Sequence, residues 1–149
     1  MTIRWKRLAN LCVFAAVVTI CSEQPSCATP NLALPPAAAQ WTLRSPQDWK
    51  RPVPADLQIW SGTTQARQVC QAEYGGSPPM RLTIYYIPGW SGATAFDALQ
   101  KWQRQPGKMA FYKGHYFGVV ESGDADRNAL NRFTTAVESS LPAGAEFHW

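Results

Sequence analysis

The chain has 149 residues, of which 46% are hydrophobic and 12% aromatic, with 14 Lys and Arg against 10 Asp and Glu. This length suits one domain, and the hydrophobic content excludes a chain that is disordered throughout. Beyond Ala28 there are 11 basic and 9 acidic residues, so the net charge there is +2. Such a small charge argues against a nucleic-acid-binding surface.

The first 28 residues have the pattern of a secretory signal peptide. Three basic residues between Arg4 and Arg7 precede an apolar run over 11–20. This run is too short to cross a bilayer, which takes about 20 helical residues. The small residues Ser26 and Ala28 predict cleavage after Ala28. We therefore expect an exported protein, periplasmic or extracellular, with no stable transmembrane span after cleavage.

Other interpretations of this segment stay open: a lipoprotein acylated at Cys21 or Cys27, or an uncleaved anchor. The cleavage site also decides the state of Cys70. Cleavage after Ala28 leaves Cys70 as a lone thiol, whereas cleavage ahead of Cys27 permits a Cys27–Cys70 disulfide. The sequence has neither a CxxC pair nor zinc-ligand spacing, and we expect no metal and no cofactor.

The residues that follow divide into a linker and one domain. The stretch 29–40 is rich in proline and alanine and predicts a linker, and 41–149 is expected to form a single domain. Its first part, 41–64, is rich in tryptophan, and its prolines argue against a long helix. We expect this part to be irregular, with a short helical turn at 54–57, and to wrap the domain through its tryptophans.

Alternation of apolar and polar residues then predicts two β-hairpins. Residues 65–74 and 80–87 form the first hairpin, and residues 109–113 and 116–121 form the second around a Gly114-His115 turn. In the first hairpin the positions that share the apolar face are Ala66, Cys70, Ala72, Tyr74, Met80, Leu82, Ile84 and Tyr86. Leu82 and Ile84 are therefore expected in the core.

A helix is predicted after each hairpin. The first begins at Ser91 or Thr94 and runs through Gln103, and the second spans about 126–141 with Asp124 or Asp126 as its cap. A turn at 105–108, with Pro and Gly at its centre, joins the first helix to the second hairpin. The order ββαββα predicts an α+β fold, with a four-stranded, mainly antiparallel sheet and both helices on one face.

Several segments resemble a family of exported bacterial proteins of uncharacterised function, over about Tyr74–Leu141. The residues that carry the resemblance are Glu73–Gly75, Leu82–Tyr86, Gly92–Phe96, Gly107–Gly114 and Phe117–Val120. The resemblance implies an exported α+β domain and supplies no activity. A strand that runs into Pro88-Gly89-Trp90 also resembles accessory proteins of envelope polysaccharide export and sorting, from which no residue roles are carried over.

No set of residues predicts catalysis. Cys70 and His115 can form a nucleophile and base, but Cys70 lies on the apolar face of its strand, where thiols are usually inert. The carboxylates of Glu121, Asp124 and Asp126 lack the glycine and distal glutamate of a calcium loop. Acidic residues before a helix are better explained by capping.

A binding face is the alternative that the pattern favours. If both helices cover one face of the sheet, the other face meets water, the 41–64 segment or a partner. Tyrosines flanked by cations bind proteins and sugars well. The candidate binding residues are Arg81, Tyr85, Tyr112, Lys113, His115 and Tyr116.

The sequence thus predicts a non-enzymatic binding or interaction module of the cell envelope, with an envelope protein or a saccharide as its partner. Two alternatives stay open. One is a small secreted enzyme of unknown class, which uses Cys70 or the three carboxylates. The other is an accessory protein of envelope polysaccharide export or sorting.

Overall fold

The computed structural model describes residues 32–45, 48–58, 63, 65–89 and 92–142. The predicted signal peptide, Cys27, Trp60 and Ser91 lie outside these residues. No helix in the described part is long and apolar enough to cross a membrane.

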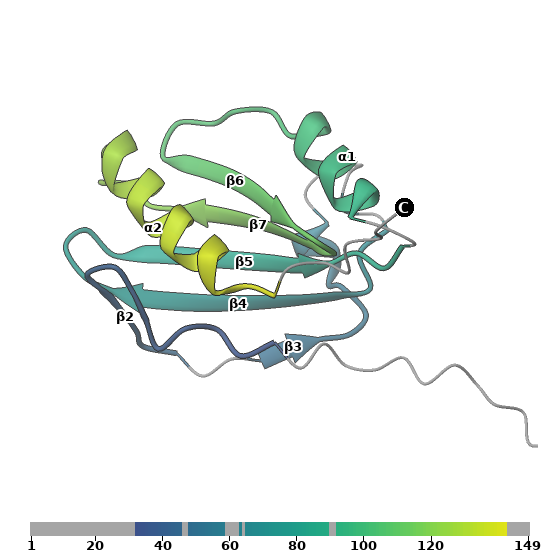
Figure 1. Ribbon diagram of the computed structural model, residues 1–149, viewed down its shortest axis with the longest axis horizontal. Coiled ribbons are helices and arrows are strands. Elements are labelled where there is room, and N and C mark those ends of the chain that lie inside the picture. The colour runs from purple at the N-terminus through teal and green to yellow at the C-terminus, as the bar shows by residue number, and fades with distance from the viewer. Residues whose placement is uncertain (1–31, 46–47, 59–62, 64, 90–91, 143–149) are drawn as a thin grey trace, which may run out of the picture.

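The described residues form a sheet and two α-helices (Figure 1). The helices are α1 (Ala93–Lys101) and α2 (Arg127–Ser140), and a 3-10 turn, η1, spans Ala55–Leu57 as predicted. The strands are β1 (Ala37–Ala38), β2 (Trp41–Leu43), β3 (Asp48–Lys50), β4 (Gln68–Gly75), β5 (Met80–Tyr86), β6 (Lys108–Lys113) and β7 (Tyr116–Glu121).

The sheet contains more strands than predicted. Its order is β1-β2-β4-β5-β7-β6, with β3 also paired to β4, which makes seven strands among the described residues. The four predicted strands β4, β5, β7 and β6 are neighbours and antiparallel, so the α+β class is confirmed. The short strands β2 and β3 cover the outer edge of β4, whose backbone groups would otherwise lack partners, and β1 pairs with β2.

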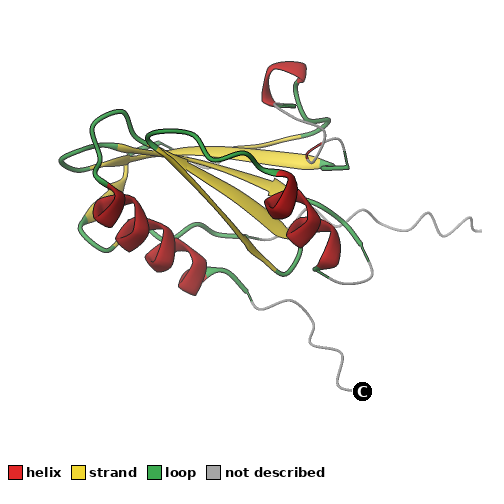
Figure 2. Cartoon of the chain, turned by 90° about the horizontal axis from the view of Figure 1, so that it is seen from above, coloured by secondary structure: helices red, strands yellow, loops and turns green. Residues whose placement is uncertain are grey.

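The two helices cover opposite faces of the sheet, so the prediction of a shared face is wrong. In β5, Leu82 and Ile84 pack in one core with α2, whereas Tyr85 packs in a second core with α1. Successive side chains of a strand point to opposite faces. Figure 2 accordingly shows the strands passing between the two helices. We call these faces the α2 face and the α1 face.

The apolar residues of the strands explain this arrangement. The α2 face buries Cys70, Ala72, Tyr74, Met80, Leu82 and Ile84, as the alternation predicted for the first hairpin, and also Val120 of β7. The prediction is wrong for Ala66, which precedes β4 and packs in the core of the α1 face. The α1 face has apolar residues of its own, namely Val69, Tyr85, Phe117 and Val119. Burial of either face by a helix therefore stabilises the folded state.

The predicted linker takes part in the core from Leu32 onward. Leu32, Leu34 and Ala38 are buried on the α2 face. Their burial shows that a proline- and alanine-rich stretch can supply core residues where its few leucines meet an uncovered sheet face. The prediction of a linker is therefore wrong for the described part of this stretch, 32–40.

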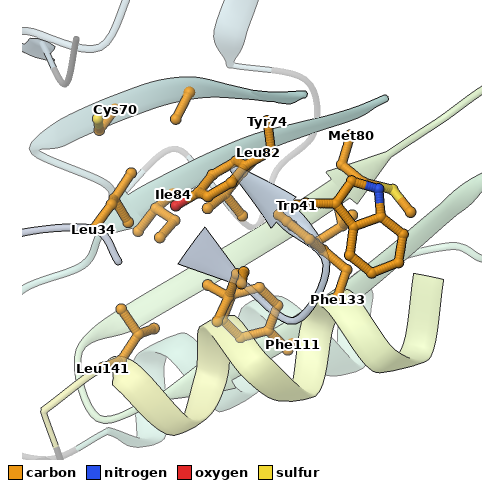
Figure 3. Packing of buried hydrophobic residues seen from close by; sticks show 14 of the residues in the cluster. Leu34, Trp41, Cys70, Tyr74, Met80, Leu82, Ile84, Phe111, Phe133 and Leu141 are labelled. Atoms are coloured by element: carbon orange, nitrogen blue, oxygen red, sulfur yellow. The ribbon is translucent and has the colours of Figure 1, made fainter. Parts of the chain in front are cut away.

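Trp41 anchors this N-terminal segment, as predicted. Its side chain is fully buried, and its Nε1–H donates a hydrogen bond to the Pro78 carbonyl oxygen at 2.7 Å. Its ring meets the ring of Phe133 edge to face, with centroids 5.5 Å apart. Figure 3 shows Trp41 and Phe133 together beneath β4 and β5. Trp49, in β3, is partly buried against the same core.

The ends of the helices agree with the prediction for α2 and differ for α1. The carboxylate of Asp126 accepts a hydrogen bond from the Ala129 N–H at 2.6 Å and caps α2. The first turn of α1 has Gly92 at its N-cap without a side-chain cap, and Thr94 lies inside the helix. The predicted turn at 105–108 forms with Gly107 at a φ of 69°, a conformation that favours glycine.

Candidate functional site

The six predicted binding residues do not share one face. Arg81 and Tyr112 are exposed on the α1 face, and Tyr85 is buried on that face. Lys113 and Tyr116 belong to the α2 face, and His115 lies in the β6–β7 turn. The structure therefore places these residues in separate environments.

Tyr85 is a core residue, so its prediction as a binding residue is wrong. Its exposed fraction is 0%, and its hydroxyl donates a hydrogen bond to the Leu57 carbonyl oxygen at 2.8 Å. Val53 and Leu57 pack in the same core as the Tyr85 ring. Burial raises the pKa of Tyr85 to about 12, and the negative charge of Asp56 adds to this effect. The segment around η1 thus closes over the part of the sheet that was expected to stay open.

Lys113, His115 and Tyr116 make contacts within the protein around the turn of the second hairpin. The Lys113 ammonium group donates a hydrogen bond to the Glu138 carbonyl oxygen at 2.9 Å, in the last turn of α2. A cation is favourable at this end of a helix. Tyr86 contacts both other residues, with ring centroids 6.2 Å from His115 and 5.7 Å from Tyr116. Burial, followed by the effect of Tyr86, raises the pKa of Tyr116.

Arg81 belongs to a row of alternating charges across the sheet. The strand register aligns Glu73 of β4, Arg81 of β5, Glu121 of β7 and Lys108 of β6. Arg81 lies 3.4 Å from the Glu73 carboxylate, and Lys108 lies 3.5 Å from the Glu121 carboxylate. Exposed pairs of this kind contribute about 0–1 kcal/mol each. The charge of Arg81 is therefore already matched within the sheet.

The candidate catalytic residues are far apart. Cys70 pairs with Ile84, which pairs with Gly118, and His115 lies three residues before Gly118 in the chain. Strand spacing and rise place the Cα atoms of Cys70 and His115 about 14 Å apart, well beyond hydrogen-bond reach. Burial raises the pKa of the Cys70 thiol to about 11. The thiol is buried and unpaired among the described residues.

The three carboxylates do not form a metal site either. Asp126 caps α2, and Glu121 pairs with Lys108. Within the described ranges no group of three or more His, Cys, Asp or Glu side chains is placed to hold a metal ion. The cap at Asp126 and the ion pair of Glu121 agree with the interpretation of these two residues as helix-capping and surface groups.

An exposed aromatic pair lies beside β6, at the edge of the sheet. Phe96 of α1 and Tyr112 of β6 have exposed fractions of 39% and 36%, and their ring centroids lie 5.2 Å apart. No other large hydrophobic side chain in the described part is as exposed as these two. Tyr112 is the one predicted binding residue that retains an open aromatic surface.

A hollow of about 560 Å³ lies at the start of β6. It lies between the end of α1, the 102–107 segment and the start of α2. Its apolar walls include Leu99, Trp102, Met109, Ala110 and Leu130, and its cations are Arg104, Lys108 and Arg127.

The aromatic pair adjoins the hollow, because each ring has a neighbouring residue in the walls of the hollow. Leu99 lies about one helical turn beyond Phe96, and Ala110 shares the β6 face of Tyr112. We call this surface the β6 groove. It comprises Phe96, Leu99, Trp102, Arg104, Lys108, Met109, Ala110, Tyr112, Arg127 and Leu130.

Most of the β6 groove could not be recognised from local pattern. The spacing of Phe96 and Leu99 on α1, with Trp102 directly after the helix, indicates an apolar stripe, which is usually a core stripe. The stripe borders an open surface because β6 is the terminal strand of the sheet. That position depends on the strand order, which the sequence pattern does not contain.

Comparisons with protein-family models, with curated proteins and with solved structures found no match to this chain. The resemblance to a family of exported bacterial proteins therefore stays a prediction.

Proposed function

We propose that this protein is an exported binding module of the cell envelope, which holds a partner protein in the β6 groove. The observation that carries the proposal is the exposed pair of Phe96 and Tyr112 beside an apolar hollow at the open edge of the sheet. The charged start of the chain and its short apolar run support export.

The physical chemistry of the β6 groove favours binding. Aromatic side chains supply large contact areas and are enriched among the residues that dominate protein interfaces. The hollow of about 560 Å³ is within the range of about 300–1,000 Å³ that is usual for binding pockets. Trp102 and Leu99 in its walls provide apolar surface next to the exposed pair.

In-cell photo-crosslinking tests this proposal. A photoreactive amino acid at the exposed position of Gln103, next to the groove residue Trp102, should crosslink the exported protein to a partner. Phe96→Ala and Tyr112→Ala should each reduce that product at least fivefold without lowering the amount of folded protein. Thr42→Ala, an exposed change on β2 at the far side of the sheet, is the control and should leave the product unchanged.

Equal crosslinking in the wild type and in both aromatic variants would contradict the proposal. A product that Thr42→Ala reduces as strongly as Tyr112→Ala would also contradict it, since the contact would then not depend on the β6 groove.

A further inference from the structure

We infer that the partner contributes an extended acidic segment, which pairs with β6 as an additional strand of the sheet. This inference rests on the proposed function, because it specifies how the β6 groove holds its partner. It is carried by the orientation of the β6 backbone, the walls of the groove and the charges around it.

The backbone of β6 has free hydrogen-bonding groups on its outer side. The Ser122 N–H donates to the Gly107 carbonyl oxygen at 2.9 Å, which makes these two residues a hydrogen-bonded pair of the β6–β7 register. Hydrogen-bonded and non-bonded pairs alternate along an antiparallel ladder. The N–H and C=O groups of Ala110 and Tyr112 therefore point away from β7, where no described strand pairs with them.

The two helices make this edge a groove rather than a flat rim. Helix α1 contacts the α1 face of β6 through Phe96 and Tyr112. Helix α2 lies on the other face, where Leu130 and Met109 line the hollow. An added strand would thus form backbone hydrogen bonds to β6 while its alternate side chains contact these two walls. The Lys108 N–H already donates to the Gln105 carbonyl oxygen, so the free edge extends from the Lys108 carbonyl to Tyr112, about 14 Å.

The charges around the groove specify an acidic partner. Arg104 and Arg127 have no ion pair within the described residues, and Lys108 is shared with Glu121. Arg127 is the first residue of α2, where the helix dipole disfavours a cation. Carboxylates of a partner would relieve this unfavourable position. A second copy of the chain is disfavoured as the occupant, because edge-to-edge pairing would bring two identical sets of cations together.

Peptide selection tests the inference without knowledge of the natural partner. The probe is a random 12-residue peptide library displayed on phage, selected on the full exported protein. Selected peptides should carry a net negative charge and alternate apolar residues. Arg104→Glu and Arg127→Glu should each weaken a selected peptide at least tenfold, whereas Lys50→Glu on β3, at the other side of the sheet, should change its affinity less than twofold.

Two measurements isolate the backbone pairing. N-methylation of those alternate peptide amides that face β6 should abolish binding, and N-methylation of the intervening amides should not. In the protein, Ala110→Pro removes an outward N–H without removing a β6–β7 hydrogen bond and should also abolish binding. If Ala110→Pro does not fold, the N-methylated peptides decide the matter, since they leave the protein unchanged.

Several results would overturn the inference. These are selection of no peptide, selection of basic or neutral peptides, and binding that survives N-methylation at every position. Formation of a dimer in sedimentation equilibrium that Ala110→Pro abolishes would assign the edge to a second copy instead. If any of these results accompanies crosslinking that depends on Phe96 and Tyr112, the proposed function stands and the added strand does not.

Discussion

Replacement of Tyr85 by alanine should destabilise the fold strongly, although Tyr112→Ala should not. Tyr85 is fully buried, and its ring centroid lies 6.1 Å from that of Phe117. Its hydroxyl donates a hydrogen bond to the Leu57 carbonyl oxygen. Truncation of a buried aromatic residue costs about 3–5 kcal/mol, a large part of the roughly 5–15 kcal/mol that stabilises a typical domain. Tyr112 is 36% exposed, so its truncation should cost about 1 kcal/mol or less.

Urea denaturation followed by tryptophan fluorescence measures both effects. Tyr85→Phe separates the hydroxyl from the ring and should cost about 1–2 kcal/mol, because the Leu57 carbonyl loses its partner. A Tyr85→Ala protein within 1 kcal/mol of the wild type would show that the α1 face is not a closed core. Equal losses for Tyr85→Ala and Tyr112→Ala would contradict the assignment of Tyr112 to an open surface.

The Tyr85 hydroxyl group predicts that the stability of the fold decreases at alkaline pH. The pKa of Tyr85 is raised from 10.0 to about 12 in the folded protein, so the folded state holds this proton more tightly than the unfolded state. The contribution of this proton to the free energy of unfolding is fully present below pH 10 and is lost as the pH rises through about 12. Urea midpoints at pH 9 and pH 11.5 should therefore differ less in Tyr85→Phe than in the wild type.

Three further measurements test other parts of the structure. Gly118→Ala should cost about 1–3 kcal/mol, because the new Cβ would overlap the Phe111 ring, and Phe111→Leu should recover part of that loss in a thermal melt. The Cys70 thiol should react slowly with a disulfide reagent at pH 8 and rapidly in urea, because burial raises its pKa to about 11. Fast reaction in the native protein would show that this strand face is open. The intact mass of the exported protein should correspond to removal of residues 1–28; a retained Met1 or a lipid-modified cysteine would contradict the proposed cleavage.

Local interactions made part of this fold predictable. Helix α2 has a capping residue, Asp126, and an apolar stripe at helical spacing, and both features act within a few residues of the chain. The alternation in 80–87 likewise identifies β5 and places Leu82 and Ile84 in the core, where the structure has them. The turn at Gly107 needs a positive φ, which the glycine permits.

The candidate site was predictable at Tyr112 alone. Alternation in the second hairpin assigns Tyr112 to the face opposite Phe111, and the structure confirms that parity. The same reasoning also placed Tyr85 opposite Leu82, correctly, yet Tyr85 is buried. Parity indicates which side chains share a face, but it does not tell whether another segment covers that face.

Tertiary structure decided what covers each face and each edge. Leu32, Leu34 and Trp41 are remote in sequence from β4 and α2, so no local period predicts that they join the same core. The second core forms because Val53 and α1 meet the apolar side chains of β5 and β7 on the α1 face. Backbone preference and periodic burial act over short distances, so the sequence identified β4–β7, α1 and α2. It missed the short strands β1–β3, which form by pairing with remote parts of the chain or with one another. The strand order that leaves β6 at an open edge arises from long-range pairing, whose free energy depends on the whole assembled sheet.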